Sequence, residues 1–256
     1  MVDIRSNTEF KMKVSAGEIE GWYDVHKFGA NNSVGASSME DVTAAGIINW
    51  LQAATTVRIK AGGNAADIAG GAGARNVCVE GLDENWDRAT EVISTAGASA
   101  SAVTTTTFIR VYRTFVEEAG AYGGNNVGAV IIENGSGGTD LMQINAGIGQ
   151  SETTSYTIPQ GHSAFITRLA SHVDASKACD MIMWKREEAD VILAPYGAKR
   201  IVQKFPQVIG PAGEVYNSHI DVPEKTDLWW TATTGSGGAA AVEADYDLTV
   251  VKDGYL

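Results

Sequence analysis

The sequence is poor in the residues that build disulfide frameworks and metal sites. Its 256 residues include two cysteines, four histidines and five prolines. Cys78 and Cys179 stand in separate apolar runs, so we expect two buried free thiols and no disulfide. No two histidines have the spacing of metal ligands, and no Cys-x-x-Cys pair occurs. The sequence therefore predicts no metal site.

Long apolar runs and an excess of basic residues are also missing. No run reaches the length of a transmembrane helix, and the first ten residues, MVDIRSNTEF, lack the apolar core of a secretory signal. We therefore expect no membrane partner and no export by the usual route. Lys and Arg number 19 against 31 Asp and Glu, for a net charge of −12. This charge argues against a nucleic-acid partner, because such binding depends on cations that neutralise phosphates.

No catalytic or cofactor-binding motif is present. The glycine-rich stretch at residues 70–74 lacks the Lys-Ser/Thr of a phosphate-binding loop, and no Gly-x-Ser-x-Gly motif occurs. Carboxylates cluster at residues 83–87 and 243–247, but neither cluster matches a calcium-binding loop. Solvated carboxylates are the ordinary interpretation, with bound calcium as the alternative. We therefore predict a non-enzymatic protein without catalytic, cofactor-binding or metal-binding residues.

What the sequence does contain is a succession of short β-prone runs separated by Gly, Asn and Pro turns. β-branched and aromatic residues dominate these runs, which is typical of strands. The predicted strands cover residues 18–28, 57–60, 76–82, 89–95, 105–117, 127–133, 141–146, 153–158, 163–173, 179–185, 191–194, 226–233 and 246–251. This spacing predicts an all-β fold, an antiparallel β-sandwich of jelly-roll-like type.

The turn-rich sequence NGSGGT at residues 134–139 indicates a boundary between two β subdomains. We predict an N-terminal arm over residues 1–17, an N-terminal β domain over residues 18–134 and a C-terminal β-sandwich over residues 140–256. Residues 38–54 are the best helix candidate, because Ser38 and Asp41 resemble a capping arrangement. A loop followed by a strand at residues 47–51 is the alternative.

Charged and aromatic residues within the predicted strands need partners. Apolar residues occupy both faces of the run at 105–117, so Arg110 and Arg113 are expected to meet carboxylates, with Asp83, Glu84 and Asp87 as candidates. Trp229 and Trp230 should point to opposite faces of their strand, since successive side chains alternate. One of them would then fill the core, and the other would be free to stack on a sugar.

Three segments resemble a known family. They are GARNVCVEGLDENW at residues 73–86, TTTTFIRVYR at residues 104–113 and SYTIPQGHSAFI at residues 155–166. They resemble virion structural proteins of tailed bacteriophages of the marine and cyanobacterial type, most closely the capsid cement, or decoration, proteins. The resemblance implies a protein that stabilises the phage head by bridging capsid subunits. It also implies the major capsid protein as partner, a homotrimer, assembly in the host cytoplasm and a place on the capsid exterior.

Two other functions stay open at the level of the sequence. The first is a tail or fibre adhesin module that binds carbohydrate. An exposed Trp22, Trp86 or Trp229 would indicate this function. The second is a carbohydrate-active enzyme on the same fold, for which the sequence offers no evident acid and base pair.

Overall fold

The computed structural model describes residues 7–174, 177–235 and 237–255 and is nearly all β, with 52% strand and 3% helix. The elements in chain order are α1 (Asn7–Ser15), β1 (Trp22–Val34), β2 (Glu40–Asp41), β3 (Val57–Ile59), β4 (Ala74–Asp83), β5 (Arg88–Ser94), β6 (Phe108–Ala119), β7 (Val130–Asn134), β8 (Asp140–Ile144), β9 (Tyr156–Thr157), β10 (His162–Val173), β11 (Cys179–Arg186), β12 (Arg200–Val208), β13 (Gly210–Val222), β14 (Asp227–Thr233) and β15 (Ala240–Lys252). All pairings between these strands are antiparallel, so the all-β prediction is confirmed.

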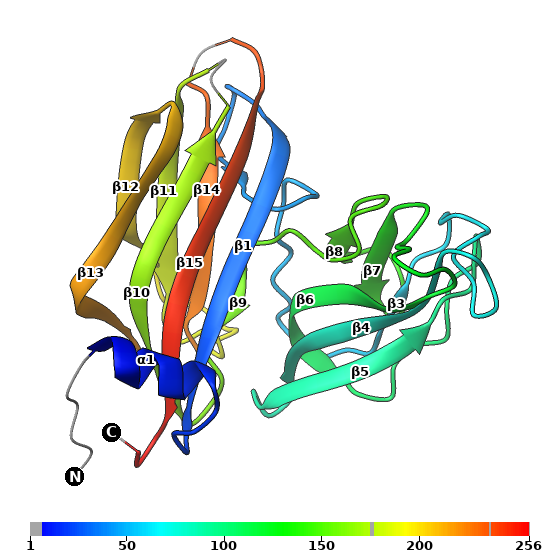
Figure 1. Cartoon of the computed structure of the whole chain (residues 1–256), viewed down its shortest axis with the longest axis horizontal. Helices are drawn as coiled ribbons and strands as arrows, with labels where there is room; N and C mark the ends of the chain where they lie inside the picture. Colours follow the sequence, from blue (N-terminus) through cyan, green and yellow to red (C-terminus); the bar gives the residue numbers. More distant parts are fainter. Residues whose placement is uncertain (1–6, 175–176, 236, 256) are drawn as a thin grey trace.

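Two sheets form a β-sandwich, on the left in Figure 1. One sheet has the order β1-β15-β10-β13, and the other has the order β12-β11-β14-β2 with β9 added on β14. Alternate residues of each strand point between the sheets, as the pleat requires. Trp230, Tyr246, Met181 and Leu169 are among the side chains buried there. Burial of these apolar side chains is the main force that holds the two sheets together.

A second β unit lies beside the sandwich, on the right in Figure 1. It contains two three-stranded sheets with the orders β5-β4-β6 and β3-β7-β8. A separate core includes Phe108, Val79, Ile132 and Ile144. The unit is therefore a compact insertion between β2 and β9, with apolar residues of its own to bury.

The predicted division of the chain at residues 134–139 differs from the strand pairing. β1 pairs with β15 along its whole length, and β2 pairs with β14. The first two strands thus belong to the sandwich that the sequence assigned to residues 140–256. The NGSGGT turn is the tight connection between β7 and β8 within the second unit. The turn-forming residues at 134–139 indicate a hairpin. Which strands belong to each unit is determined by pairing between segments that are far apart in the sequence.

Several local predictions also need correction. Residues 38–54 form no helix: β2 joins the sandwich, and the backbone N–H of Ile48 donates to Asp41. The alternative strand at residues 47–51 is also absent. Part of the predicted N-terminal arm forms α1, with Phe10 packed edge-on against Trp22, while residues 1–6 lie outside the described residues. The sequence predicted no strand between residues 194 and 226, where β12 and β13 lie.

The two β units meet at a buried ion cluster. Arg110 of β6 donates two hydrogen bonds to Asp227 of β14, at 2.9 and 3.1 Å, and the two side chains are 3% and 1% exposed. Arg186 and Thr157 donate to the same carboxylate, at 3.0 and 2.7 Å. Arg110 also stacks over Trp86. The predicted partners Asp83, Glu84 and Asp87 are therefore wrong for Arg110, and Arg113 pairs with Glu80.

Candidate interaction surface

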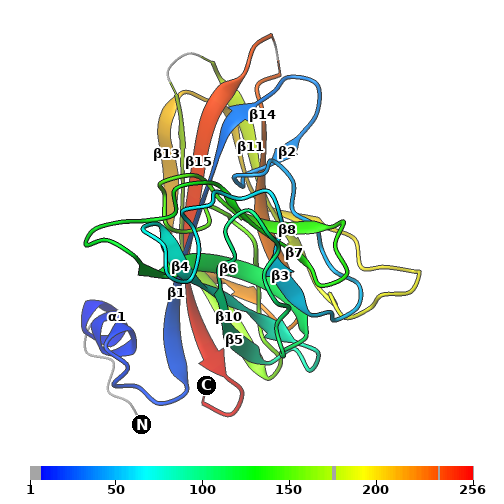
Figure 2. The ribbon, with the colours of Figure 1, turned by 90° about the vertical axis from the view of Figure 1, so that its right-hand side faces the viewer.

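The feature that stands out on the surface is the loop between β11 and β12, residues 187–199, which we call the β11–β12 loop. Its tip is a run of six apolar residues, Val191, Ile192, Leu193, Ala194, Pro195 and Tyr196, and all six are exposed. Leu193 has 77% of its surface accessible. In Figure 2 the loop, drawn in yellow, extends beyond the strands at the right of the picture.

The base of this loop is held by polar contacts on its N-terminal side. Ala189 is buried, its N–H donates to the backbone carbonyl of Lys225 at 2.8 Å, and its own carbonyl accepts a hydrogen bond from Arg110 at 3.5 Å. Asp190 forms an ion pair with Lys225 at 2.9 Å. The buried ion cluster that joins the two β units thus also fixes the start of the loop.

The two ends of the loop are held together across its base. Glu187 lies between Lys185, at 2.9 Å, and Arg200. The hydrogen bond from Lys185 and the charges of both cations lower the pKa of Glu187 below its ordinary value, so it stays ionised. Lys199 lies over the ring of Trp184 at 4.2 Å. An anchored base therefore presents an apolar tip to solvent.

This run was missed as a functional feature by the sequence analysis, which predicted a strand at residues 191–194. The β-branched residues gave that prediction, but no described strand pairs with the segment. A useful signal was available: the run VILAPY shows no alternation of apolar and polar residues, and charged residues flank it on both sides. A run of this kind needs burial on every side or a partner.

The acidic clusters considered for calcium have other contacts. Asp83 accepts backbone hydrogen bonds from Asn85 and Asp87, which closes a turn. Asp245 and Asp247 lie on one face of β15, and both contact Arg168, at 2.5 and 3.3 Å. Among the described residues, no group of three His, Cys, Asp or Glu side chains is placed to hold a metal ion.

The tryptophans named for sugar binding lie mostly inside the protein. Trp86 is 8% exposed and Trp229 is 7% exposed, packed against Trp50. Trp230 fills the sandwich core and stacks on Phe205. Trp22 is half-buried, and its ring N–H donates to the carbonyl of Tyr255. Cys78 and Cys179 are buried free thiols, as expected, and burial raises the pKa of each.

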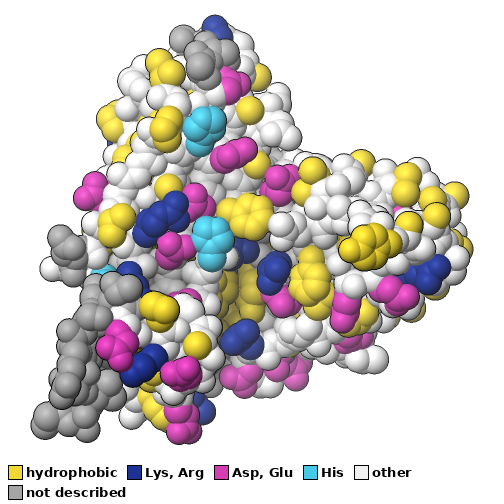
Figure 3. Space-filling view, viewed as in Figure 1, with side chains coloured by type: hydrophobic (Ala, Val, Ile, Leu, Met, Phe, Trp, Pro, Cys, Tyr) yellow, Lys and Arg dark blue, Asp and Glu magenta, His cyan; other side chains and the backbone are white. Residues whose placement is uncertain are grey.

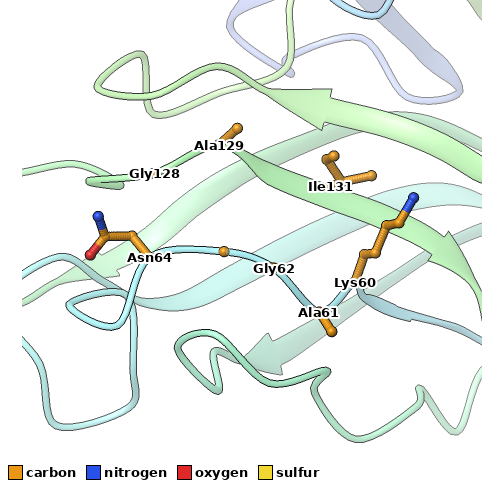
Figure 4. Close-up of a pocket in the computed structure, with 8 residues that line it drawn as sticks. Lys60, Ala61, Gly62, Asn64, Gly128, Ala129 and Ile131 are labelled. Carbon is orange, nitrogen blue, oxygen red and sulfur yellow. The ribbon is translucent and has the colours of Figure 1, made fainter.

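A small pocket on the second β unit offers little chemistry. Its volume is about 290 Å³, and its walls include Gly62, Asn64, Gly128 and Ile131 (Figure 4). Lys60 at its edge is the charged group among the lining residues, and its ammonium is bound to Asp140 at 2.8 Å. That hydrogen bond raises the pKa of Lys60. The lining provides no acid and base pair for catalysis.

Charge on the face shown in Figure 3 is mixed. Lys and Arg side chains lie singly among Asp and Glu, and no basic patch stands out on that face. No helix within residues 7–174, 177–235 and 237–255 has the length and apolar character that crossing a bilayer requires.

Comparison with protein-family models and with curated proteins finds no match. Among solved structures, that of infectious bursal disease virus Gt strain aligns over 92% of this chain and 72% of its own, with 9% identity and a TM-score of 0.28. An isomalto-dextranase of Arthrobacter globiformis T6 complexed with panose aligns over 90% of this chain and 35% of its own, with 12% identity and a TM-score of 0.23. Similarities this low carry no argument about fold or function.

Proposed function

We propose that this chain is a non-enzymatic structural protein of a phage virion, a cement protein that binds the outside of the capsid. The observation that carries the proposal is the exposed apolar tip, residues 191–196, on the anchored base of the β11–β12 loop. Contiguous exposed apolar residues on a soluble protein mark a surface that binds another protein. An anchored base supports tight binding, because less conformational freedom is lost when the tip is buried.

Three further observations support this function. The sequence segments at residues 73–86, 104–113 and 155–166 resemble phage cement proteins. The net charge of −12 suits a protein that stays outside the DNA-filled interior. The pocket lined by Gly62, Asn64, Gly128 and Ile131 is small, with a volume of about 290 Å³. On this proposal the partner is the major capsid protein, and the cement protein acts as a homotrimer after assembly in the host cytoplasm.

Binding of this kind would stabilise the head by mass action. A protein that binds the assembled shell and not its free subunits shifts the equilibrium toward the shell. The apolar tip would insert between capsid subunits and bury its side chains there. The adhesin alternative receives less support, because Trp86 and Trp229, two of the three tryptophans that would serve it, are buried.

The proposal is tested by cryo-EM of the particle that carries this protein. The expected result is regular density on the outer shell at junctions between capsid subunits, with residues 191–196 at the contact. Density confined to the tail, or none in the particle, would overturn the proposal.

A binding experiment tests the tip itself. The variant Ile192→Asp/Leu193→Asp should bind shells of the major capsid protein at least about tenfold more weakly, equivalent to about 1.4 kcal/mol. Val103→Asp is the matched control, because Val103 is 48% exposed and belongs to the second β unit. Equal binding by both variants and the unchanged protein would show that the tip is not the contact.

A further inference from the structure

A groove lies on the second β unit, beside β7. It consists of two adjoining hollows of about 290 and 480 Å³, whose walls share Lys60 and Ile131. The smaller hollow lies between residues 61–64 and 128–129 (Figure 4), and the larger lies between residues 43–49 and β8. We call the two hollows together the β7 groove. Its size is within the range of pockets that bind small molecules, about 300–1,000 Å³.

The charges in the groove cancel. Lys60 and Asp140 are the charged side chains among the lining residues of the two hollows. The Lys60 ammonium donates to both carboxylate oxygens of Asp140, at 2.8 and 2.9 Å. An anionic ligand would have to displace Asp140 from Lys60, and a cationic ligand would have to displace Lys60 from Asp140. The lining therefore favours a neutral ligand.

Three side-chain amides line the groove, and each is held by a protein hydrogen bond at one end. Asn49 Nδ2 donates to the carbonyl of Asp140 at 2.7 Å, Gln143 Nε2 donates to Asn145 Oδ1 at 2.7 Å, and Asn64 Oδ1 accepts from the N–H of Ala66 at 2.9 Å. The opposite ends are two amide oxygens and one NH₂ group, which have no hydrogen-bond partner in the described part of the chain. The groove therefore presents two oriented acceptors and one oriented donor to a ligand.

Buried polar groups hold one wall of the groove in place. Asp67 is 3% exposed, and its carboxylate accepts hydrogen bonds from the N–H groups of Val127 and Gly128, both at 2.8 Å. Asn126 is 1% exposed and donates to the carbonyls of Gly128 and Asn145, at 2.7 and 2.8 Å. A wall fixed in this way loses little conformational freedom on binding, which favours affinity.

From this lining we propose that the β7 groove binds a neutral oligosaccharide. A sugar hydroxyl both donates and accepts hydrogen bonds, so it pairs with the free oxygens of Asn49 and Gln143 and with the free NH₂ group of Asn64. Ile131 and Ile47, the latter 58% exposed, offer apolar contact to the C–H groups of the sugar rings. The groove binds the sugar without cleaving it, because its lining contains one carboxylate and glycoside hydrolysis uses two.

A peptide is a poorer match to this sheet. A peptide that binds a β-sheet adds a strand to a free edge. The β3 edge is already covered, since the N–H groups of Ser101 and Thr104 donate to the carbonyls of Ile59 and Val57, at 3.0 and 2.8 Å. The groove instead offers side-chain amides at separate points, which fits hydroxyl groups spread around a ring.

The experiment screens the isolated protein against neutral glucose-, galactose- and mannose-based oligosaccharides, with sulfated glycans, sialylated glycans and neutral tetrapeptides in the same screen. Isothermal titration calorimetry then measures the dissociation constant of the neutral oligosaccharide that binds best. Gln143→Ala and Ile131→Ala should each raise this constant about tenfold, because the first removes an acceptor and the second removes an apolar contact. An unchanged thermal transition shows that each variant remains folded.

Gln160→Ala is the matched control, since it makes the same substitution at an exposed glutamine in the turn before β10, and it should leave the dissociation constant unchanged. Binding of no neutral oligosaccharide would overturn the inference, as would binding of anionic glycans alone or of peptides alone. Equal dissociation constants for Gln143→Ala, Ile131→Ala and the unchanged protein would place the sugar elsewhere and also overturn it. The inference does not rest on the proposed function, since it concerns the isolated chain without capsid protein.

Discussion

At the scale of single residues, the most unusual group is a lysine without an acidic partner in the interior. Lys27 of β1 is buried, and its ammonium donates a hydrogen bond of 2.5 Å to the carbonyl of Tyr112 in the second β unit. Burial and the nearby charge of Arg113 together lower the pKa of Lys27 to about 7, against a smaller opposing effect of Glu80. The ordinary value of 10.5 holds for the unfolded chain.

This lysine predicts a pH-dependent stability. Between pH 7 and pH 10.5 the unfolded chain holds a proton on Lys27 that the folded chain has released, so stability rises with pH across this window. Lys27→Met removes the effect. Relative to this variant, the unchanged protein should gain about 1.4 kcal/mol per pH unit within the window. Urea denaturation at pH 7 and pH 10 measures the difference, and parallel pH profiles for the two proteins would contradict the prediction.

For Arg110, the sequence predicted the kind of partner correctly but not which residue it is. The sequence predicted that this arginine needs a carboxylate, because its strand is apolar on both faces. Arg110 does pair with a carboxylate, but that carboxylate belongs to Asp227, 117 residues further along the chain. Nearby acidic residues were natural candidates, yet no local pattern carries information about a contact between strands of two different β units.

At the scale of elements, the strand segments with β-branched and aromatic residues were predicted well. β4, β5, β6, β10 and β11 all lie within or close to the predicted ranges. The failures lie where tertiary contacts overrode local preference. Residues 191–194 have strand-forming residues but no described pairing strand. Residues 38–54 carry a capping pattern, but Glu40 and Asp41 within them pair with β14.

A glycine in β4 gives a prediction at this scale. A methyl group at Gly81 would lie 2.0 Å from the carbonyl oxygen of Arg110, in the bulged register between β4 and β6. Gly81→Ala should therefore destabilise the protein by about 1–3 kcal/mol, because the two backbones must separate. Gly70→Ala is the control, since nothing lies within 4 Å of that position. Chemical denaturation measures both, and equal stabilities would refute the close approach.

At the scale of the whole molecule, the buried ion cluster joins two units with separate cores. Leu82, Trp86 and Tyr112 of the second unit also pack against the sandwich core. The units should therefore unfold together in one thermal transition. The same cluster holds the base of the β11–β12 loop, so the rigidity of the proposed capsid contact depends on how the two units are joined.

Asp227→Asn tests this coupling. The substitution leaves Arg110 and Arg186 without a buried counter-charge and should destabilise the fold by about 3–5 kcal/mol. Differential scanning calorimetry should show a lower transition temperature and separate transitions for the two units. Asp140→Asn, which breaks the exposed pair with Lys60, should change stability by less than about 1 kcal/mol. One unshifted transition in Asp227→Asn would contradict the coupling.

The sequence by itself determined the all-β class, most of the strands, the acidic charge and the two buried thiols. These properties follow from composition and from alternation within short segments, which report local conformation and burial. Only the tertiary structure decided which strands share a sheet, as when Trp22 pairs with Val251 near the other end of the chain. It also decided that residues 191–196 are exposed and that Asn49 and Gln143 line one groove. Pairing and exposure depend on contacts between distant segments, and no local pattern encodes them.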